Sequence, residues 1–178
     1  VDKETLSYVA EIAPDVRILA LNCDSKNETK GTIDERLLKW AKEQLDKAKE
    51  DKAYTIAMCH YPIIPSVPVF DLVGDAHVKN WREIATFLAD NGVSLVLTGH
   101  MHIQSINEFT TQKGNKLYDV CTATTVGTPG KYRKIEITET GKMDVKSIPV
   151  CDFTIPNNFN SCEEFFDWRF KYSVKNKI

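Results

Sequence analysis

The stretch Val93-Ser-Leu-Val-Leu-Thr-Gly-His-Met-His102 joins a short apolar run directly to a pair of histidines. Such a run is typical of a strand that is buried on both faces, as in a parallel sheet. Two similar runs precede it, at Val16-Arg-Ile-Leu-Ala-Leu-Asn22 and at Tyr54-Thr-Ile-Ala-Met-Cys59, and the second of these ends at His60. The three runs therefore predict three buried strands.

Amphipathic segments separate these predicted strands. Apolar residues recur at helical spacing after Thr32-Ile-Asp-Glu35, which has the pattern of a capping box with Thr32 as the N-cap residue. This predicts a helix over residues 33–50, and the same spacing predicts a second helix over residues 78–91 that ends before Gly92. The alternation of strands and helices indicates an α/β fold.

Beyond His102 the pattern changes to short β-type segments. Gly-containing turns separate four of them, which predicts an antiparallel meander over residues 104–109, 116–124, 131–139 and 142–150. We therefore expect a layered β-sandwich flanked by helices. An aromatic-rich tail follows at residues 151–178; we expect a helix that packs on its own domain, the alternative being a helix that docks on a partner or a membrane.

Composition excludes several classes of protein. The 178 residues are 42% hydrophobic, which argues against disorder, and their number is typical of one domain. With 23 basic and 25 acidic residues the net charge is -2, so bulk charge does not indicate a nucleic-acid-binding surface. The longest apolar run, Val93 to Leu97, is far shorter than the roughly 20 residues that a membrane helix needs.

The five cysteines form no C-x-x-C pair and no zinc-knuckle spacing. Cys23, Cys59 and Cys121 belong to apolar segments, and we expect them to be buried as small hydrophobic residues. Cys151 and Cys162 lie in a more polar part of the chain and would be able to pair in an oxidising compartment. An odd number of cysteines does not favour a complete disulfide framework.

Histidines follow two of the three predicted buried strands. Ligands gather at the carboxyl ends of the strands in open α/β sheets, so neighbouring strands would bring His60, His100 and His102 to one edge. Gly99 is expected to provide the sharp exit from its strand, because glycine adopts backbone angles that other residues avoid. Histidine clusters suit zinc, iron, nickel or manganese, which makes a metal site one interpretation; polar strand-end residues without a ligand are the other.

These residues also carry a family resemblance. Cys59-His60-Tyr61-Pro62, followed by Gly99-His100-Met101-His102, resembles the last two motifs of the calcineurin-like metallophosphoesterases. Flanking segments extend the resemblance over residues 5–150. The resemblance implies a metal-dependent phosphoesterase of the metallo-dependent phosphatase fold, which hydrolyses phosphomonoesters or phosphodiesters.

The resemblance also implies a dinuclear site and its chemistry. Two divalent ions (manganese, iron, zinc or nickel) would lie at the strand ends, with His60 and His100 on one ion and His102 on the other. A metal-bound hydroxide would attack phosphorus in line with the leaving oxygen. Residues 61–70, an expected irregular loop, and residues 122–130 would line the cleft. Substrate, choice of metal and compartment, cytoplasmic or exported, stay open.

The family's earlier motifs, D-x-H, G-D-x-x-D and G-N-H-[DE], do not occur in this sequence. Gly74-Asp75-Ala76-His77-Val78 looks similar to the second motif, but Val78 stands in the place of its second aspartate. We interpret this segment as a loop in which His77 is exposed or caps a helix. Residues 1–150 then resemble the C-terminal part of a calcineurin-like phosphoesterase domain, and residues 151–178 its tail.

The earlier motifs supply the bridging carboxylate, further ligands and a proposed general acid in the family. We therefore expect weak metal binding and little or no activity from this chain by itself. We also expect association with the missing N-terminal half or with a second copy of the chain, because an incomplete sheet exposes backbone groups and apolar surface. The alternatives are a non-catalytic binding or scaffold module that keeps part of the fold, and a structural histidine-metal site.

Overall fold

The computed structural model describes residues 1–24, 31–72, 76–125, 127, 130–138, 140, 142–150, 154–156 and 158–175. The chain forms two compact units, Val1–Cys121 and Thr122–Ile178. The first unit holds the histidines and is described first. The predicted domain limits, 1–150 and 151–178, stay a prediction.

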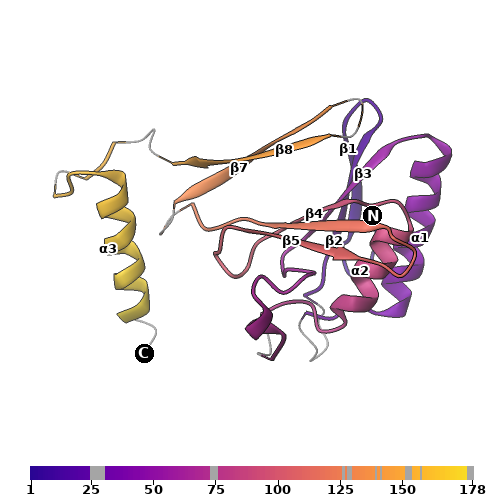
Figure 1. Ribbon diagram of the computed structural model, residues 1–178, viewed down its shortest axis with the longest axis horizontal. Helices are drawn as coiled ribbons and strands as arrows, with labels where there is room; N and C mark the ends of the chain where they lie inside the picture. Colours follow the sequence, from indigo (N-terminus) through magenta and orange to yellow (C-terminus); the bar gives the residue numbers. More distant parts are fainter. Residues whose placement is uncertain are drawn as a thin grey trace. The chain divides into compact units, whose positions relative to one another are not determined.

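A six-stranded mixed sheet forms the centre of the first unit, with strand order β1-β2-β3-β4-β6-β5. Its four inner strands run parallel to one another, and an antiparallel strand closes each edge (Figure 1). The strands are β1 (Tyr8–Ala13), β2 (Val16–Leu21), β3 (Tyr54–Cys59), β4 (Leu95–Thr98), β5 (Ser105–Thr110) and β6 (Lys116–Cys121). The three predicted buried strands are thus confirmed as β2, β3 and β4, and the α/β fold class is confirmed.

The predicted four-stranded meander is wrong. β5 and β6 form an antiparallel hairpin, but β6 also pairs parallel with β4 inside the large sheet. The last two segments, β7 (Lys131–Ile137) and β8 (Met143–Pro149), form a two-stranded sheet of their own in the second unit. The physical reason is burial, because Leu117, Val120 and Cys121 make β6 an interior strand rather than the half-exposed strand of a meander.

β1 has no counterpart among the predicted elements. It pairs antiparallel with β2 through a tight turn at Pro14 and Asp15, and Asp15 adopts a positive φ of 58°. All six of its residues are exposed or half-buried, so it lacks the apolar run that marks a buried strand. The Pro-Asp turn between two strand-like segments is the signal that would have revealed it.

Two helices pack on the large sheet. α1 (Glu35–Glu50) contacts β2 and β3, and α2 (Trp81–Asp90) contacts β5 and β6. Each buries one apolar stripe, as the helical spacing predicts; the buried residues are Leu37, Ala41, Leu45 and Ala48 in α1 and Ile84, Ala85, Leu88 and Ala89 in α2. Gly92 follows α2 with a positive φ of 89°, as expected for a C′ residue.

The N-cap of α1 is Asp34 and not Thr32. The Asp34 side chain accepts a hydrogen bond from the Leu37 backbone N–H at 2.8 Å, and its own backbone is extended. The residue before it is held elsewhere, because the Asn80 side chain bonds both the N–H and the carbonyl of Ile33. This tie keeps Ile33 out of the helix and shifts the cap by two residues.

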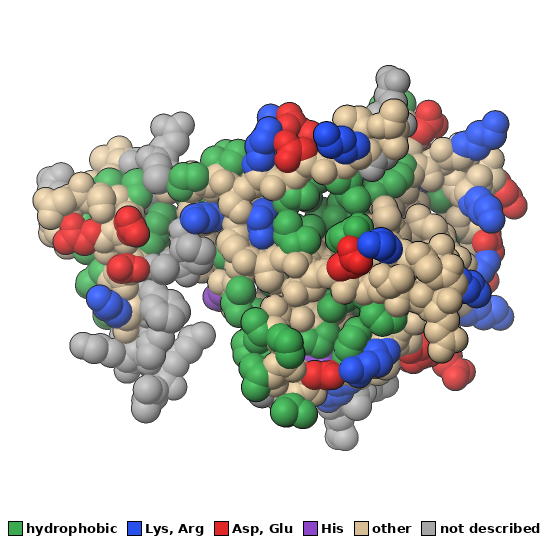
Figure 2. Space-filling model, viewed as in Figure 1, with side chains coloured by type: hydrophobic (Ala, Val, Ile, Leu, Met, Phe, Trp, Pro, Cys, Tyr) green, Lys and Arg blue, Asp and Glu red, His purple; other side chains and the backbone are tan. Residues whose placement is uncertain are grey.

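The loop after β3 is largely irregular, as predicted, and ends in the short 3-10 helix η1 (Pro68–Leu72). On the face shown in Figure 2, Lys and Arg side chains are interspersed with Asp and Glu, in line with the small net charge. None of the described helices combines the length and the apolar character that crossing a membrane requires.

The second unit contains the β7–β8 hairpin and α3 (Cys162–Lys175). Phe166 of α3 is buried, and its ring lies against Gly130. The ring leaves no room for a Cβ atom at position 130, where the backbone also has a positive φ. Phe159, Phe165, Trp168 and Tyr172 form a chain of ring contacts beside it. The predicted aromatic helix is therefore confirmed. Cys151, one half of the considered Cys151–Cys162 pair, lies outside the described residues.

Candidate functional site

His60 and His100 meet at the carboxyl edge of the large sheet. His60 directly follows β3 and His100 follows β4 by two residues, and these two strands are parallel neighbours. His60 Nε2 lies 3.1 Å from His100 Nδ1. The ring centroids are 5.0 Å apart at an interplanar angle of 80°. The topology thus brings together two histidines that are 40 residues apart in the sequence.

The backbone and an aromatic ring fix this pair. The Gly99 N–H donates to the His60 carbonyl oxygen at 3.0 Å, which ties the two histidine segments together. The buried ring of Tyr61 lies over His100 with a centroid distance of 4.0 Å. Because the two imidazoles are already held in place from two sides, a ligand that binds to them would lose little free energy to ordering their side chains.

The chain turns sharply at the histidines themselves. His100 and His102 have positive φ values of 60° and 54°, in the left-handed region that costs a non-glycine residue about 1 kcal/mol or more. Gly99 does not adopt a positive φ, and a Cβ at this position would meet the His60 carbonyl oxygen at an ordinary 3.8 Å. The expected role of Gly99 as the sharp exit is therefore wrong, because the two histidines make that turn.

His102 stands apart from the pair. Its side chain is exposed, and within the described part of the chain no hydrogen bond or ring contact joins it to His60 or His100. It is close enough to act on His60 electrostatically. Partial burial and the neighbouring His100 lower the pKa of His60, which favours its neutral imidazole, the form that binds metals.

A buried carboxylate forms hydrogen bonds with both of the chain segments that carry the paired histidines. Asp119 of β6 is fully buried and accepts hydrogen bonds from the backbone N–H groups of Ile63 and Ile64, just after His60. Its other oxygen accepts from the Thr98 hydroxyl, just before His100. Burial raises the pKa of Asp119 to about 6 despite these three donors. Sequence reasoning missed this residue, although a charged residue inside the apolar run Leu117-Tyr-Asp-Val-Cys121 was the available signal.

The histidine pair fits part of a metal site. Two nitrogens that each lie about 2.0–2.1 Å from one ion are separated by roughly 2.8–3.4 Å in octahedral or tetrahedral geometry, and the observed 3.1 Å agrees. Among the described residues, however, no group of three or more histidine, cysteine or carboxylate side chains converges on one point. The described part of the chain therefore offers two converging imidazoles and no complete ligand set.

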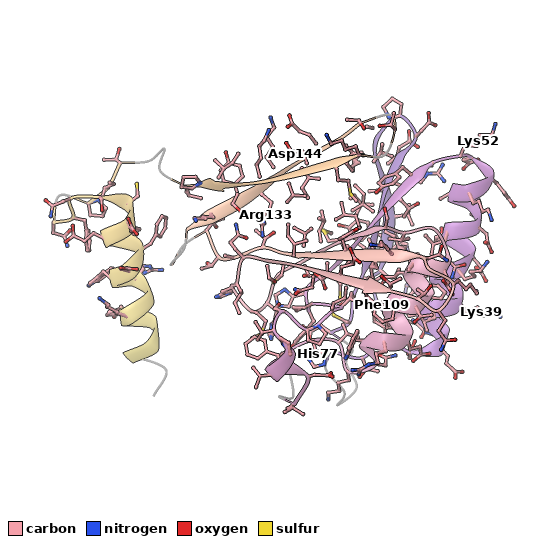
Figure 3. The ribbon with its side chains drawn as sticks, in the orientation of Figure 1. Lys39, Lys52, His77, Phe109, Arg133 and Asp144 are labelled. Atoms are coloured by element: carbon pink, nitrogen blue, oxygen red, sulfur yellow. The ribbon has the colours of Figure 1, made fainter. Side chains whose placement is uncertain are left out.

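The fourth histidine does not join the site. His77 lies in the loop before α2 (Figure 3), where it is buried and its Nε2 lies 3.5 Å from Asp71 Oδ1. The expectation that His77 is exposed or caps a helix is wrong. Val78 and Lys79 donate to the carbonyls of Pro62 and Gly31, and these bonds fold the loop inward. Gly74 and Asp75 of the same motif lie outside the described residues.

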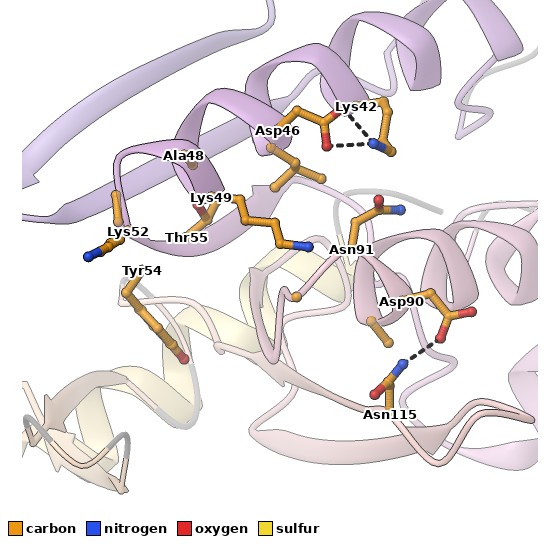
Figure 4. A pocket seen from close by; sticks show the side chains of 14 residues that line it. Lys42, Asp46, Ala48, Lys49, Lys52, Tyr54, Thr55, Asp90, Asn91 and Asn115 are labelled. Carbon is orange, nitrogen blue, oxygen red and sulfur yellow. Dashed lines mark hydrogen bonds and ion pairs between the residues drawn. The ribbon is translucent and has the colours of Figure 1, made fainter.

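A cavity of about 570 Å³ opens elsewhere, at the C-terminal ends of α1 and α2 (Figure 4). Its lining includes Lys49, Lys52 and Tyr54, and two of its polar pairs, Lys42–Asp46 and Asp90–Asn115, bond each other. The start of β3 contributes to this cavity, whereas the histidines follow the strand ends. The cavity is therefore no part of the histidine site.

Comparisons with solved structures found two similar proteins, and the first of them has a similar fold. A dimetal phosphatase from Danio rerio matches with a TM-score of 0.59 at 14% identity, over 79% of this chain and 57% of that one. A Staphylococcus aureus protein assigned as a 5'-nucleotidase matches with a TM-score of 0.46 at 14% identity, over 95% of this chain and 33% of that one. The chain thus spans 57% of the length of the dimetal phosphatase. A comparison with curated proteins gave no match.

The sequence itself matches a family profile. Residues 13–104, more than half of the chain, match the profile of the calcineurin-like phosphoesterases. The matched segment contains β2, β3 and β4 and all three site histidines. The chain therefore belongs to the calcineurin-like phosphoesterase family.

Proposed function

We propose that this chain carries part of the metal centre of a phosphoesterase that hydrolyses phosphomonoesters or phosphodiesters. The observation that supports this most directly is the 3.1 Å approach of His60 Nε2 and His100 Nδ1 in a chain of this family. His60 and His100 would hold one divalent ion, and His102 would contribute to a second. Such ions lower the pKa of a bound water and neutralise charge on phosphoryl oxygens.

The chain's own residues would position this chemistry. Tyr61 supports the ring of His100, and Asp119 fixes the loops on which both paired histidines stand. Exposed His102 faces solvent, where a second ion or a substrate phosphate has access. Two imidazoles without a carboxylate bind a divalent ion weakly. We therefore propose that a further polypeptide segment supplies the missing ligands, and that the chain alone has little or no activity.

Metal titration tests the centre. Zinc or manganese is titrated calorimetrically into the purified chain and into its His60→Ala and His100→Ala variants. We expect each variant to bind the metal about tenfold or more weakly than the unchanged chain. His77→Gln is the matched control, because His77 is the one histidine outside the three proposed metal ligands. The metal affinity of this variant should equal that of the unchanged chain. Equal affinity in all four proteins would contradict the proposed ligands.

An activity assay tests the second part of the proposal. p-Nitrophenyl phosphate and its bis ester are offered to the chain with added manganese or nickel. We expect no turnover above that of the His100→Ala variant. Turnover that this substitution abolishes would show that the chain alone is active, and would overturn the proposed need for further ligands.

The second candidate is a non-catalytic binding or scaffold module. The observation that favours it is that the described residues contain no group of three converging metal ligands. A module of this kind would show no change in metal affinity on substitution of His60 or His100. The titration above therefore separates the two candidates.

A further inference from the structure

Two cysteine thiols face each other beside the strand end that carries His60. Cys23 Sγ lies 3.0 Å from Cys59 Sγ, and the two residues are only 1% and 5% exposed. Cys59 immediately precedes His60. Neither thiol belongs to the histidine site, so their proximity needs its own explanation.

The backbone holds both thiols in place. β2 and β3 are parallel and in register, with Leu21 beside Cys59, so the chain that leaves β2 passes the end of β3. Cys23 follows two residues later, and its carbonyl accepts the Gly31 N–H at 3.0 Å. Asn22 accepts the Asp24 N–H through its side chain, which fixes the turn on the other side of Cys23. The pair therefore arises from the sheet and its loop.

A shared metal ion does not account for this pair. Two thiolates on one zinc ion, each about 2.3 Å from it, would be roughly 3.8 Å apart, well beyond the observed 3.0 Å. No third metal-ligating side chain joins the two within the described ranges. In the reduced chain the 3.0 Å separation is that of a hydrogen bond between the two thiols, and a disulfide of about 2.0 Å would need an approach of about 1 Å.

We propose that Cys23 and Cys59 form a reversible disulfide, a redox modification site beside His60 whose oxidant is a hydroperoxide. One thiolate attacks an oxygen of hydrogen peroxide; the O–O bond breaks, and the departing hydroxide takes a proton to become water. The second thiol attacks the resulting sulfenic sulfur, the S–S bond forms, and the displaced oxygen leaves as a second water. Two thiols are oxidised by two electrons, and one peroxide is reduced to two waters.

The surroundings of the pair support this chemistry. An open cavity of about 280 Å³ is lined by Cys59 and His60 together with Ser7, Asn22 and Met58. It gives a small oxidant a path to Cys59, and Cys23 lies 3.0 Å behind that thiol without lining the cavity itself. A hydrogen bond from the Cys59 thiol to the Cys23 thiolate lowers the pKa of Cys23 below its usual value. A thiolate is the reactive form of cysteine, so Cys23 is the more readily ionised of the two thiols, whereas Cys59 is the more accessible.

The disulfide would link the loop after β2 to the strand end that carries His60. Cys23 and Cys59 are 36 positions apart, so the crosslink would close a long loop and restrict the unfolded chain. We therefore expect the thermal unfolding midpoint to rise on oxidation and to return on reduction. This inference stands independently of the proposed metal centre.

Peptide mapping of the full chain tests the proposal without metal or substrate. The chain is reduced, freed of reductant, and treated with hydrogen peroxide in the presence of a chelator. We expect two of its five thiols to be lost, one peptide pair linked through Cys23 and Cys59, and full recovery of the thiols with dithiothreitol. Retention of all five thiols, linkage to another cysteine, or oxidation that dithiothreitol does not reverse would overturn it.

Variants make the assignment specific. Cys23→Ser and Cys59→Ser should each abolish the linked peptide and the rise in unfolding midpoint. Cys121→Ser is the matched control, because Cys121 is also buried at the end of an inner strand but bonds the Gly99 carbonyl instead, and it should leave the linked peptide intact. Circular dichroism checks the fold of each variant. The mapping of the unchanged chain decides the question even if one variant does not fold.

Discussion

Asp119 shows how one side chain organises a site that it does not enter. It lies on β6, whereas the groups it bonds follow β3 and end β4, so three strands depend on one carboxylate. An unpaired buried carboxylate would be costly, but here three donors satisfy it. We conclude that Asp119 positions the histidine loops.

Removal of this carboxylate should strongly destabilise the folded chain. Asp119→Ala leaves the N–H groups of Ile63 and Ile64 and the Thr98 hydroxyl without their acceptor, and we expect the free energy of unfolding to fall by about 3 kcal/mol. Urea denaturation measures this loss. Asp46→Ala, which breaks an exposed pair with Lys42, is the control and should cost about 0.5 kcal/mol or less. Similar losses in both variants would refute the role of Asp119.

Asp119 should also leave a signature in the pH dependence of stability. Its pKa is raised from 3.8 to about 6 in the folded chain, so the folded state binds more protons than the unfolded state between these values. The resulting stabilisation is fully present below about pH 3.8 and is lost as the pH rises through about 6.

Asp119→Asn removes this titration, so we expect the stability of the unchanged chain, relative to that of the variant, to fall as the pH rises through this range. Denaturant titrations at several pH values measure the difference. The carboxylate of Asp2 acts in the opposite sense, because bonds from Arg36 and Thr5 hold its pKa well below the usual value and its contribution is lost as the pH falls. Both proteins keep Asp2, so its effect cancels. Parallel stability curves would speak against a raised pKa for Asp119.

At the scale of elements, the start of α1 depends on a tertiary contact. Thr32 and Asp34 are both suitable N-cap residues, but the bonds from Asn80 to Ile33 leave only Asp34 at the helix end. We expect Asp34→Ala to lower the free energy of unfolding by about 1 kcal/mol, measured by urea denaturation. Thr32→Ala is the matched comparison and should change it by less than about 0.5 kcal/mol. A larger loss of stability in Thr32→Ala than in Asp34→Ala would indicate that Thr32 is the N-cap residue after all.

At the scale of the whole molecule, the large sheet ends in two edge strands, β1 and β5. Exposed edges and apolar side chains promote association, and Ile12 of β1 and Ile106 of β5 are 59% and 48% exposed. We propose that the chain self-associates, with a mass in light scattering above its 20.2 kDa.

Edge substitutions identify the surface that would be involved. Ile12→Lys should restore the monomer if copies pair through β1, and Ile106→Lys should do so if they pair through β5, because a charge on an edge strand opposes pairing. Each variant is the control for the other. A monomer of the unchanged chain at all concentrations would disprove the association.

The sequence by itself determined the three buried strands, both helices on the large sheet and the family, because apolar runs, helical spacing and the His60 and Gly99–His102 motifs are local patterns. Only the tertiary structure decided that β6 lies beside β4, that Asp119 serves both histidine loops, and that Cys23 meets Cys59. The physical reason is that these features join groups distant in the chain. Local patterns fix which surfaces a segment must bury, whereas the packing of the sheet selects the partner that buries them.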